Sequence, residues 1–178
     1  AGKVFNFDVE VVEPLKIGST IVSSSKIRDL IQQGEIEEAS KLLGRDYPII
    51  GKVVEGAKRG QTLGFPTANI EISDELYPKA GVYAVKVEHH EQPFNGLANV
   101  GFNPTFLPEK TGGGKPLFFE VYILGFNRDI YGEEIQVSFK RRIRDEIRFD
   151  SSSQLIQQIQ KDIQWAQENV FEKLKLNS

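Results

Sequence analysis

The sequence predicts a mainly β fold, a six-stranded barrel or sandwich, with one amphipathic helix after it and two short helices before it. Three observations support this prediction. Short β-rich runs separated by glycine, proline and asparagine fill the middle of the chain from Tyr47 to Phe139. A helical apolar period follows Ser151, and helix start and stop signals precede Gly44. At 178 residues and 39% hydrophobic composition, the chain can bury one core.

Residues 1–45 differ from the rest because their pattern is largely helical. Serine before an apolar period is a typical helix start, and glycine just after the last apolar residue is a typical stop. The expected elements are a strand at Val4–Val12, a helix at Ser23–Ile31 closed by Gly34, and a helix at Ile36–Leu43 closed by Gly44. We expect these residues to form a unit separate from a β-rich domain at 46–178.

The β-rich domain is expected to contain a barrel at 46–150 and a helix at 151–170. The strands are predicted at Ile49–Val54, Ala68–Ile72, Val82–Val87, Phe94–Val100, Leu117–Leu124 and Ile135–Phe139. Ser151 with Gln154 three residues later forms a capping box. One apolar stripe then follows, made of Leu155, Ile156, Ile159, Ile163, Ala166 and Val170. Such a helix is expected to pack its stripe on the barrel.

Composition excludes several classes of function. A net charge of −3 argues against broad nucleic-acid binding, and no apolar run reaches membrane-spanning length. Without cysteine there is neither a disulfide nor a thiolate metal site. His89 and His90 are adjacent at a strand end, where neighbouring side chains point to opposite faces, so we interpret them as solvated loop residues rather than ligands, and nothing in the sequence supports a zinc site. We expect a cytoplasmic monomer that binds neither nucleic acid nor membrane.

Residues Gly60 to Ile70 form the most informative segment, Gly-Gln-Thr-Leu-Gly-Phe-Pro-Thr-Ala-Asn-Ile. Thr67 and Asn69 lie two positions apart, so an extended backbone directs both side chains the same way. Two neutral oxygens in that arrangement suit a hard cation such as Mg²⁺, which completes its shell with water and substrate phosphate. The same residues also suit an ordinary turn, and the local sequence alone favours the turn.

The loop before this segment carries two cations between glycines. Gly56-Ala-Lys-Arg-Gly60 contains Lys58 and Arg59, and backbone N–H groups in such a loop can surround an anion. It is not a Walker loop, because no segment of the chain has the required spacing of glycines before Lys-Ser or Lys-Thr. A nucleotide that binds here would therefore bind outside the P-loop fold.

Glu120 interrupts an otherwise apolar and aromatic strand, Leu117 to Leu124. Desolvation in such surroundings raises the pKa of a carboxyl group, and a carboxylate of this kind beside a cleft is a candidate general base. The alternative is a glutamate at a strand edge or one paired with Arg141, Arg142 or Arg144. Spacing alone does not decide between these two interpretations.

Two further loops contain residues expected at a binding site. Pro108 to Pro116 has Gly112 to Gly114 at its centre, which suits either a mobile lid or a long hairpin connection. Arg144, Glu146 and Phe149 lie between the last strand and the helix, where they could hold a planar ligand. The alternative for these three residues is a solvated turn with an ion pair.

Six motifs together resemble bacterial riboflavin kinase over residues 46–178. They are Gly-Phe-Pro-Thr-Ala-Asn at 64–69, Gly-Val-Tyr-Ala at 81–84, Asn-Val-Gly-Phe-Asn-Pro-Thr-Phe at 99–106, Glu-Val-Tyr-Ile at 120–123, Tyr-Gly at 131–132 and Arg-Asp-Glu at 144–146. The resemblance implies a six-stranded antiparallel Greek-key barrel. It also implies transfer of the γ-phosphate of ATP to the 5′-hydroxyl of riboflavin, which gives FMN and ADP.

The resemblance also implies roles for individual residues. Thr67 and Asn69 match the Mg²⁺-coordinating pair of the family, and Glu120 matches its catalytic base. The positions implied at the nucleotide are Gly56, Lys58, Arg59, Gly60, Gly64, Pro66, Thr67 and Tyr131. The positions implied at the flavin are Arg144, Glu146 and Phe149. The run Gly112 to Gly114 departs from the family pattern, which is usually less glycine-rich in this connection.

Residues 1–45 resemble the end of the FMN adenylyltransferase module that precedes the kinase in the bacterial bifunctional protein. Val22-Ser-Ser-Ser-Lys-Ile-Arg28 matches its Ser-Ser-Thr/Ser-x-Ile-Arg ending and leads into a helical connector. The early His-x-Gly-His motif of that module is absent, because the only histidines are His89 and His90. We therefore expect no FAD synthesis from this chain.

Two functional classes remain open at this stage. The first is the riboflavin kinase, which the presence of Thr67, Asn69 and Glu120 favours. The second is a non-catalytic barrel that binds flavin or nucleotide. An oligonucleotide-binding barrel is disfavoured by the acidic balance and by the lack of a basic stripe with interleaved aromatic residues.

Overall fold

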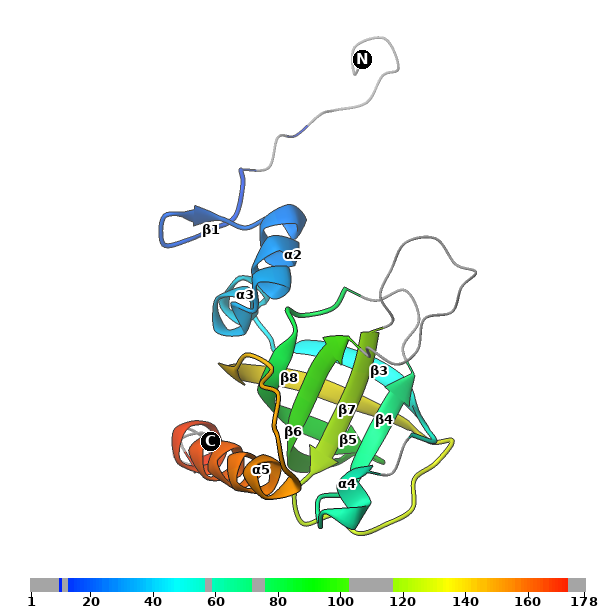
Figure 1. Cartoon of the computed structure of the whole chain (residues 1–178). Coiled ribbons are helices and arrows are strands. Elements are labelled where there is room, and N and C mark those ends of the chain that lie inside the picture. Colours follow the sequence, from blue (N-terminus) through cyan, green and yellow to red (C-terminus); the bar gives the residue numbers. More distant parts are fainter. Residues whose placement is uncertain (1–9, 11–12, 57–58, 72–75, 103–116, 173–178) are drawn as a thin grey trace, which may run out of the picture.

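The computed structural model describes residues 10, 13–56, 59–71, 76–102 and 117–172. Its centre is a closed barrel of antiparallel strands in the order β3-β4-β7-β6-β5-β8 (Figure 1). The six strands are β3 Tyr47–Val54, β4 Thr67–Glu71, β5 Gly81–His89, β6 Gln92–Phe102, β7 Leu117–Ile123 and β8 Glu134–Arg144. Strands β5 to β8 lie side by side in the order 8-5-6-7, which is the Greek-key arrangement. The predicted fold class is confirmed, with a barrel rather than a sandwich.

Alternating side chains of these strands fill the barrel. Tyr83, Phe119 and Phe139 form an aromatic layer, in which the ring centroids of Phe119 and Phe139 lie 5.7 Å apart and those of Tyr83 and Phe139 lie 5.2 Å apart. Val121 on the strand of Phe119 is also completely buried. Because successive strand residues point to opposite faces, the residues between these core positions face outward.

The helices predicted before the barrel are both present. Helix α2, Ser24–Gln33, begins after Ser23, whose Oγ accepts a hydrogen bond from Lys26 N at 3.2 Å. Helix α3, Ile36–Leu43, ends at Gly44, which has a left-handed φ of 70°. A two-stranded hairpin that the sequence did not predict, β1 Lys16–Ile17 with β2 Thr20–Ile21, precedes α2. The strand expected at Val4–Val12 lies outside the described residues apart from Glu10.

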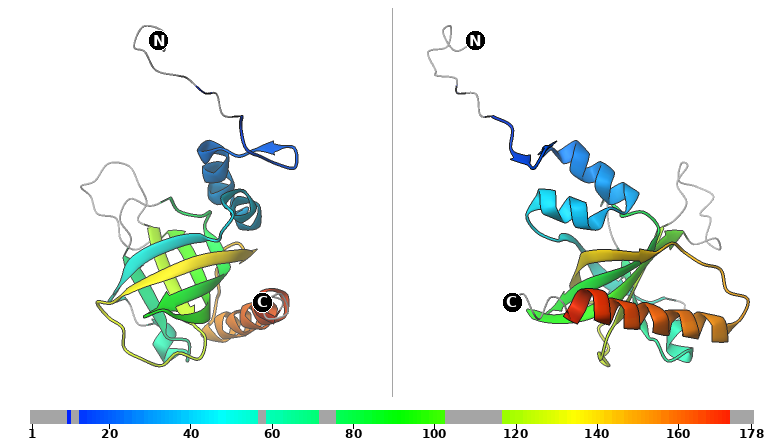
Figure 2. Two further views of the ribbon diagram at one scale, coloured as in Figure 1. Left: turned by 180° about the vertical axis from the view of Figure 1, so that it is seen from behind. Right: turned by 90° about the vertical axis from the view of Figure 1, so that its left-hand side faces the viewer.

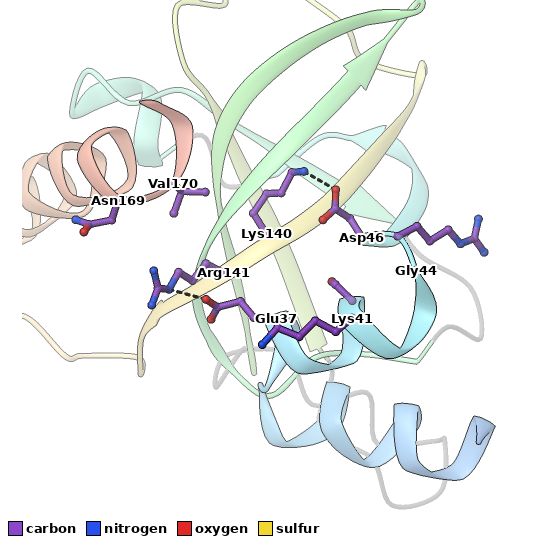
Figure 3. Close-up of a pocket in the computed structure, with 10 residues that line it drawn as sticks. Glu37, Lys41, Gly44, Asp46, Lys140, Arg141, Asn169 and Val170 are labelled. Atoms are coloured by element: carbon purple, nitrogen blue, oxygen red, sulfur yellow. Dashed lines mark hydrogen bonds and ion pairs between the residues drawn. The ribbon is translucent and has the colours of Figure 1, made fainter. Parts of the chain in front are cut away.

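Ion pairs fasten α3 and the residues after it to strand β8 (Figure 3). Arg141 Nε lies 3.0 Å from Glu37 Oε1, and Lys140 pairs with Asp46. The guanidinium of Arg141 also lies over the Trp165 ring, 5.4 Å from its centroid. The two ion pairs border a cavity of about 590 Å³, and none of the site residues predicted from the sequence lines it. The contacts make α3 part of the same packed body as the barrel wall.

The predicted C-terminal helix is present and packs on the outside of the barrel, away from α2 and α3 (Figure 2). Helix α5, Ser152–Ala166, continues into one π-helical turn, η1, Gln167–Phe171. Its buried residues Ala166, Val170 and Phe171 contact Ala84 and Leu97 of the barrel. No helix in the described part of the chain is long and apolar enough to cross a membrane.

The capping box predicted at the start of this helix is only half formed. Ser151 Oγ accepts a hydrogen bond from Gln154 N at 3.3 Å, as expected. The Gln154 side chain, however, accepts from the backbone N–H of Asp150 at 3.1 Å. In a full capping box, the N–H of the capping serine itself would be the donor.

Candidate active site

Three polar side chains form one row across the outside of the barrel. Asn69 of β4 lies directly opposite Glu120 of β7, which in turn lies directly opposite Asn99 of β6. Directly opposite residues in antiparallel strands share a face, with Cβ atoms about 5 Å apart. Phe119 and Val121 point into the core, so this face is the outer one. We refer to Asn69, Glu120 and Asn99 as the polar row.

Thr67 extends the polar row along β4. It lies two residues before Asn69 and directly opposite Tyr122, which is two residues after Glu120. The same outer face of β4 and β7 therefore carries the side chains of Thr67, Asn69, Glu120 and Tyr122. The ring of Phe65 packs against the Tyr122 ring edge-on at 5.5 Å, next to this group. The structure thus brings together Thr67, Asn69 and Glu120, the three residues that the sequence singled out as a metal pair and a base.

Two glycines allow the main chain to contact this pair. A Cβ atom at Gly56 would lie 1.9 Å from Asn69 Nδ2, and one at Gly60 would lie 2.3 Å from Phe65 O and 3.3 Å from Thr67 Oγ1. Gly60 belongs to α4, Arg59–Thr62, a single helical turn before β4. The loop between β3 and β4 therefore packs its backbone directly on the side chains of Thr67 and Asn69, which only glycine permits.

A cavity of about 410 Å³ opens beside Thr67 and Asn69. One wall comes from the loop before β4, including Gly56, Gln61 and Pro66. The segment from Phe126 to Tyr131, which follows β7, lines another part of the cavity. We call this space the β4 cavity. Among the positions predicted for the nucleotide, four line the β4 cavity: Gly56, Pro66, Thr67 and Tyr131.

The cavity-lining segment after β7 contributes residues that the sequence did not single out. Arg128 lies over the Phe126 ring at 5.9 Å from its centroid, and Asp129 Oδ1 accepts a hydrogen bond from Tyr131 N at 3.1 Å. Asn127 lines the same cavity. Arg128 is thus a cation at the β4 cavity. The sequence signal available was a polar run, Asn127 to Asp129, between apolar residues.

Asn99 is a second residue that the sequence did not single out, although its motif was noted. Its Oδ1 is buried and accepts no hydrogen bond from the described residues. Buried polar atoms normally have a partner, so an orphaned acceptor beside Glu120 is unusual. A ligand hydroxyl that reaches Glu120 would come close to this oxygen as well.

Glu146 lies over the next row of the same face. A Cβ atom at Gly101 would lie 2.1 Å from Glu146 Oε1, so the carboxylate sits directly on the Gly101 main chain. Gly101 lies opposite Phe118. Gly101 is two residues after Asn99 on β6, and Phe118 is two residues before Glu120 on β7. The Glu146 side chain is exposed overall, but this contact removes water from its carboxylate. Loss of hydration raises the pKa of Glu146, and the charge of Arg144 partly opposes the rise.

Arg144 is held by the C-terminal helix. Its Nε lies 3.0 and 2.9 Å from the two carboxylate oxygens of Asp162, and its Nη2 lies 2.7 Å from Asp162 Oδ2. Asp162 is buried and also accepts from Gln158 Nε2 at 2.8 Å. The prediction of Arg144 in a loop is wrong, because β8 continues to this residue. Asp162 was missed, although a carboxylate beside the apolar stripe of the helix was a signal.

The remaining predicted site residues lie either outside the described residues or outside the lining of the β4 cavity. Lys58 and the loop from Pro108 to Pro116, with Gly112 to Gly114, lie outside the described residues, as does the Arg59 side chain. Phe149 is half-buried after the last strand. Gly64 has a left-handed φ of 86° in the turn before β4 and does not line the β4 cavity.

The interpretation of the histidines is wrong in part. His90 is exposed, as expected, but His89 is only 5% exposed. The Nε2 atom of each histidine contacts the carboxylate of Glu133.

The fold and the site together define a closed antiparallel barrel with a cavity next to a row of polar side chains. The family model of riboflavin kinase, Flavokinase, matches residues 43–170. The chain therefore belongs to the riboflavin kinase family. Enzymes of this family phosphorylate riboflavin, and they use ATP and a divalent metal ion in doing so.

Individual relatives agree with this assignment. The bifunctional riboflavin kinase/FMN adenylyltransferase of Listeria monocytogenes is 43% identical over 159 residues, which are 89% of this chain and 49% of the relative. That of Bacillus subtilis is 41% identical over 157 residues, 88% of this chain and 49% of the relative. The chain thus spans about half the length of the curated relatives it matches.

A solved structure supports the fold. The crystal structure described as a macrolide-efflux protein from Streptococcus pneumoniae superposes with a TM-score of 0.83 at 41% identity. The match covers 93% of this chain and 53% of that one.

Proposed function

We propose that this chain transfers the γ-phosphate of ATP to the 5′-hydroxyl of riboflavin, with Mg²⁺ held by Thr67 and Asn69 and with Glu120 as the general base. One observation carries the proposal: Glu120 lies directly opposite Asn69, in the same outer row of the barrel. A base and a metal pair must be adjacent for a phosphoryl group to be delivered to a deprotonating alcohol.

The donor set at Thr67 and Asn69 fits a small hard cation. Both side chains offer a neutral oxygen, and the glycines at 56 and 60 hold the loop backbone against them. Mg²⁺ binds through few protein oxygens and keeps other positions for water and phosphate. Bound there, the cation would neutralise charge on the phosphates of ATP.

The nucleotide is assigned to the β4 cavity. Its volume of about 410 Å³ falls in the range of small-molecule sites, and Thr67 and Asn69 form part of its wall. The segment from Phe126 to Tyr131 contributes Tyr131 and Arg128 to the lining. The aromatic ring of Tyr131 suits the adenine base of the nucleotide, and the cation of Arg128 suits its phosphate chain. Lys58 and Arg59, in the loop between glycines, complete the proposed set of cations.

Riboflavin is assigned to the other side of Glu120. Glu146 and Phe118 lie on the next row of the same face, so a flavin bound there would direct its ribityl chain toward the polar row. In this arrangement, Glu120 accepts the proton of the 5′-hydroxyl while that oxygen attacks the γ-phosphorus, and the bond from this phosphorus to the ADP leaving group breaks. Arg144, Glu146 and Phe149 would border the isoalloxazine ring.

The function is tested by measuring FMN formation from riboflavin and ATP with Mg²⁺, with FMN and FAD separated as products. We expect FMN. Substitution Glu120→Gln removes the base but keeps the size of the side chain, so kcat should fall by about 10²- to 10⁴-fold. Riboflavin binding, followed by flavin fluorescence, should change little.

The matched control is Glu88→Gln, which removes an exposed carboxylate from β5. This variant should form FMN at the wild-type rate. Unchanged turnover in Glu120→Gln would exclude Glu120 as the base. Binding of riboflavin or ATP without any FMN from the wild-type chain would instead support the non-catalytic barrel.

We also propose that residues 1–45 belong to the junction with an FMN adenylyltransferase module. The matched relatives carry both activities in their names, and their similarity extends over 89% of this chain, beyond the kinase match at residues 43–170. The proposed setting is a cytoplasmic monomer whose ligands are riboflavin, FMN, ATP and ADP, without nucleic acid.

A further inference from the structure

The two histidines of the chain converge on one glutamate at the end of the barrel strands. His89 Nε2 lies 2.6 Å from Glu133 Oε2, and His90 Nε2 lies 2.9 Å from the same oxygen. One nitrogen from each histidine and one carboxylate oxygen all lie within 4.8 Å of one another. None of these three residues belongs to the polar row or to the walls of the β4 cavity.

The turn between β5 and β6 explains how adjacent residues can meet. His89 pairs with Gln92, so His90 and Glu91 form a two-residue hairpin turn. Both have positive φ, 48° and 62°, as a type I′ turn requires. This left-handed backbone brings the His90 ring to 4.3 Å from the His89 ring, measured between centroids. The alternation of an extended strand, which would separate the two side chains, ends at His89.

The three side chains differ in exposure in a way that suits ion capture. His89 is 5% exposed, and its ring packs edge-on against Phe126 at 5.7 Å between centroids. The His90 and Glu133 side chains are 77% and 39% exposed. One ligand is therefore fixed by packing, and two can adjust around an entering ion.

We propose that His89, His90 and Glu133 form a binding site for one divalent transition-metal ion, with Zn²⁺ the best match. Two imidazole nitrogens and one carboxylate oxygen are a common three-ligand set for zinc, with the fourth position left to water. Zinc bonds of about 2.0–2.1 Å place tetrahedral ligands about 3.3 Å apart, so small side-chain shifts suffice here. Thr67 and Asn69 offer only neutral oxygens, which suit Mg²⁺ instead.

The location of the site suggests what a bound ion would do. Glu133 follows Gly132, whose N–H donates to Val53 O at 2.8 Å, while Val53 N donates to Glu133 O at 2.8 Å. The segment is thus fastened to β3, and Tyr131 of the β4 cavity lies two residues before Glu133. An ion held by the three side chains would tie the β5–β6 turn to this segment.

The experiment is titration of the full chain with ZnCl₂ by calorimetry, without nucleotide and with excess Mg²⁺ to occupy hard-cation sites. We expect one Zn²⁺ per chain and a higher melting temperature. His90→Asn removes an exposed ligand, and asparagine tolerates the left-handed backbone. Loss of a residue that only supports a metal ligand already lowers metal affinity by about 10- to 100-fold. His90→Asn and Glu133→Gln, which each remove a ligand, should therefore bind Zn²⁺ at least about tenfold more weakly than the wild type.

The matched control is Glu134→Gln, which changes the charge by the same amount on the adjacent exposed residue. Glu134→Gln should bind Zn²⁺ with the affinity of the wild type. With Co²⁺ in place of Zn²⁺, the wild type and Glu134→Gln should show the absorption bands of a tetrahedral Co²⁺ site, and His90→Asn should lose them. Equal affinity in the wild type, His90→Asn and Glu133→Gln would overturn the proposal. Absence of Zn²⁺ binding by the wild-type chain would also overturn it and would leave a histidine–glutamate hydrogen-bond cluster.

Discussion

The two sides of the polar row are fixed by different kinds of contact. On the β4 side, the main chain of Gly56 and Gly60, in the loop that precedes β4, holds Asn69 and Thr67. On the β8 side, Arg144 is held by the carboxylate of Asp162, on a helix that packs against the barrel from outside. One side relies on close backbone approach, and the other relies on a buried ion pair.

This difference has a physical consequence for tolerance to substitution. A site built on backbone approach fails when a single methyl group is added, although the fold can survive. A site built on a buried ion pair fails when one charge is removed, and the fold loses stability with it. The four substitutions below separate these two modes of support, from the largest expected effect to the smallest.

Asp162→Asn should have the largest effect. The Arg144 and Asp162 side chains are only 17% and 4% exposed, so removal of one charge leaves the other buried without its counter-ion. We expect a loss of about 3 kcal/mol in the free energy of unfolding, measured with urea. Glu38→Gln breaks the exposed pair of Glu38 and Lys41, whose side chains are 55% and 63% exposed, and should cost far less because solvent already screens that pair. Equal losses in the two variants would contradict this account.

Gly56→Ala should abolish most activity while the fold is kept. The added Cβ would lie 1.9 Å from Asn69 Nδ2, so the Asn69 side chain must leave its present position opposite Glu120. A misplacement of about 1 Å costs about 100-fold in kcat, as measured by FMN formation. Gly44→Ala is the control, since its Cβ would meet nothing within 4 Å but its φ is +70°. That variant should lose stability and keep activity, the reverse of Gly56→Ala.

Asn99→Ala should reduce kcat about tenfold, as expected for loss of one hydrogen bond in the transition state. Its Oδ1 has no partner among the described residues, so the free energy of unfolding should change by less than about 0.5 kcal/mol. Asn95→Ala, on the same strand and face, is the matched control and should leave kcat unchanged. Full activity in Asn99→Ala would remove Asn99 from the site.

Glu146→Gln should have the smallest effect, and the effect depends on pH. Burial raises the pKa of Glu146 above its usual value of 4.5, so the folded state binds this proton more tightly than the unfolded state. The carboxylate therefore lowers stability once pH rises above 4.5, and the penalty disappears on acidification. Urea unfolding should show the glutamine variant slightly more stable than the wild type at about pH 7 and equal to it at about pH 4. A constant difference at both pH values would refute this sign.

The sequence was sufficient where the controlling interactions are local. Ser23, Gly34 and Ser151 mark helix ends through contacts within a few residues, and the predicted ends are close to the observed ones. Short β-rich runs between turn residues predicted all six barrel strands. Thr67 and Asn69 were recognisable because two residues on one strand share a face whatever the rest of the fold does.

The contacts that sequence reasoning missed are long-range. The charged residues Lys140 to Arg144 hid the second half of β8, because apolar alternation stops at Phe139 while the pairing with β5 continues. The pairing of Arg144 with Asp162 depends on how the helix docks. The meeting of His89 and Glu133 depends on the register of different strands, which no local pattern encodes.

The ring of six strands also governs how this chain can associate with others. Each strand of the barrel has hydrogen-bonded neighbours on both sides, because β8 pairs with both β3 and β5. In the described part of the chain, unpaired strand edges are confined to the two-residue strands β1 and β2. Edge-to-edge growth into larger sheets, a common route to aggregation, therefore finds no template on the barrel.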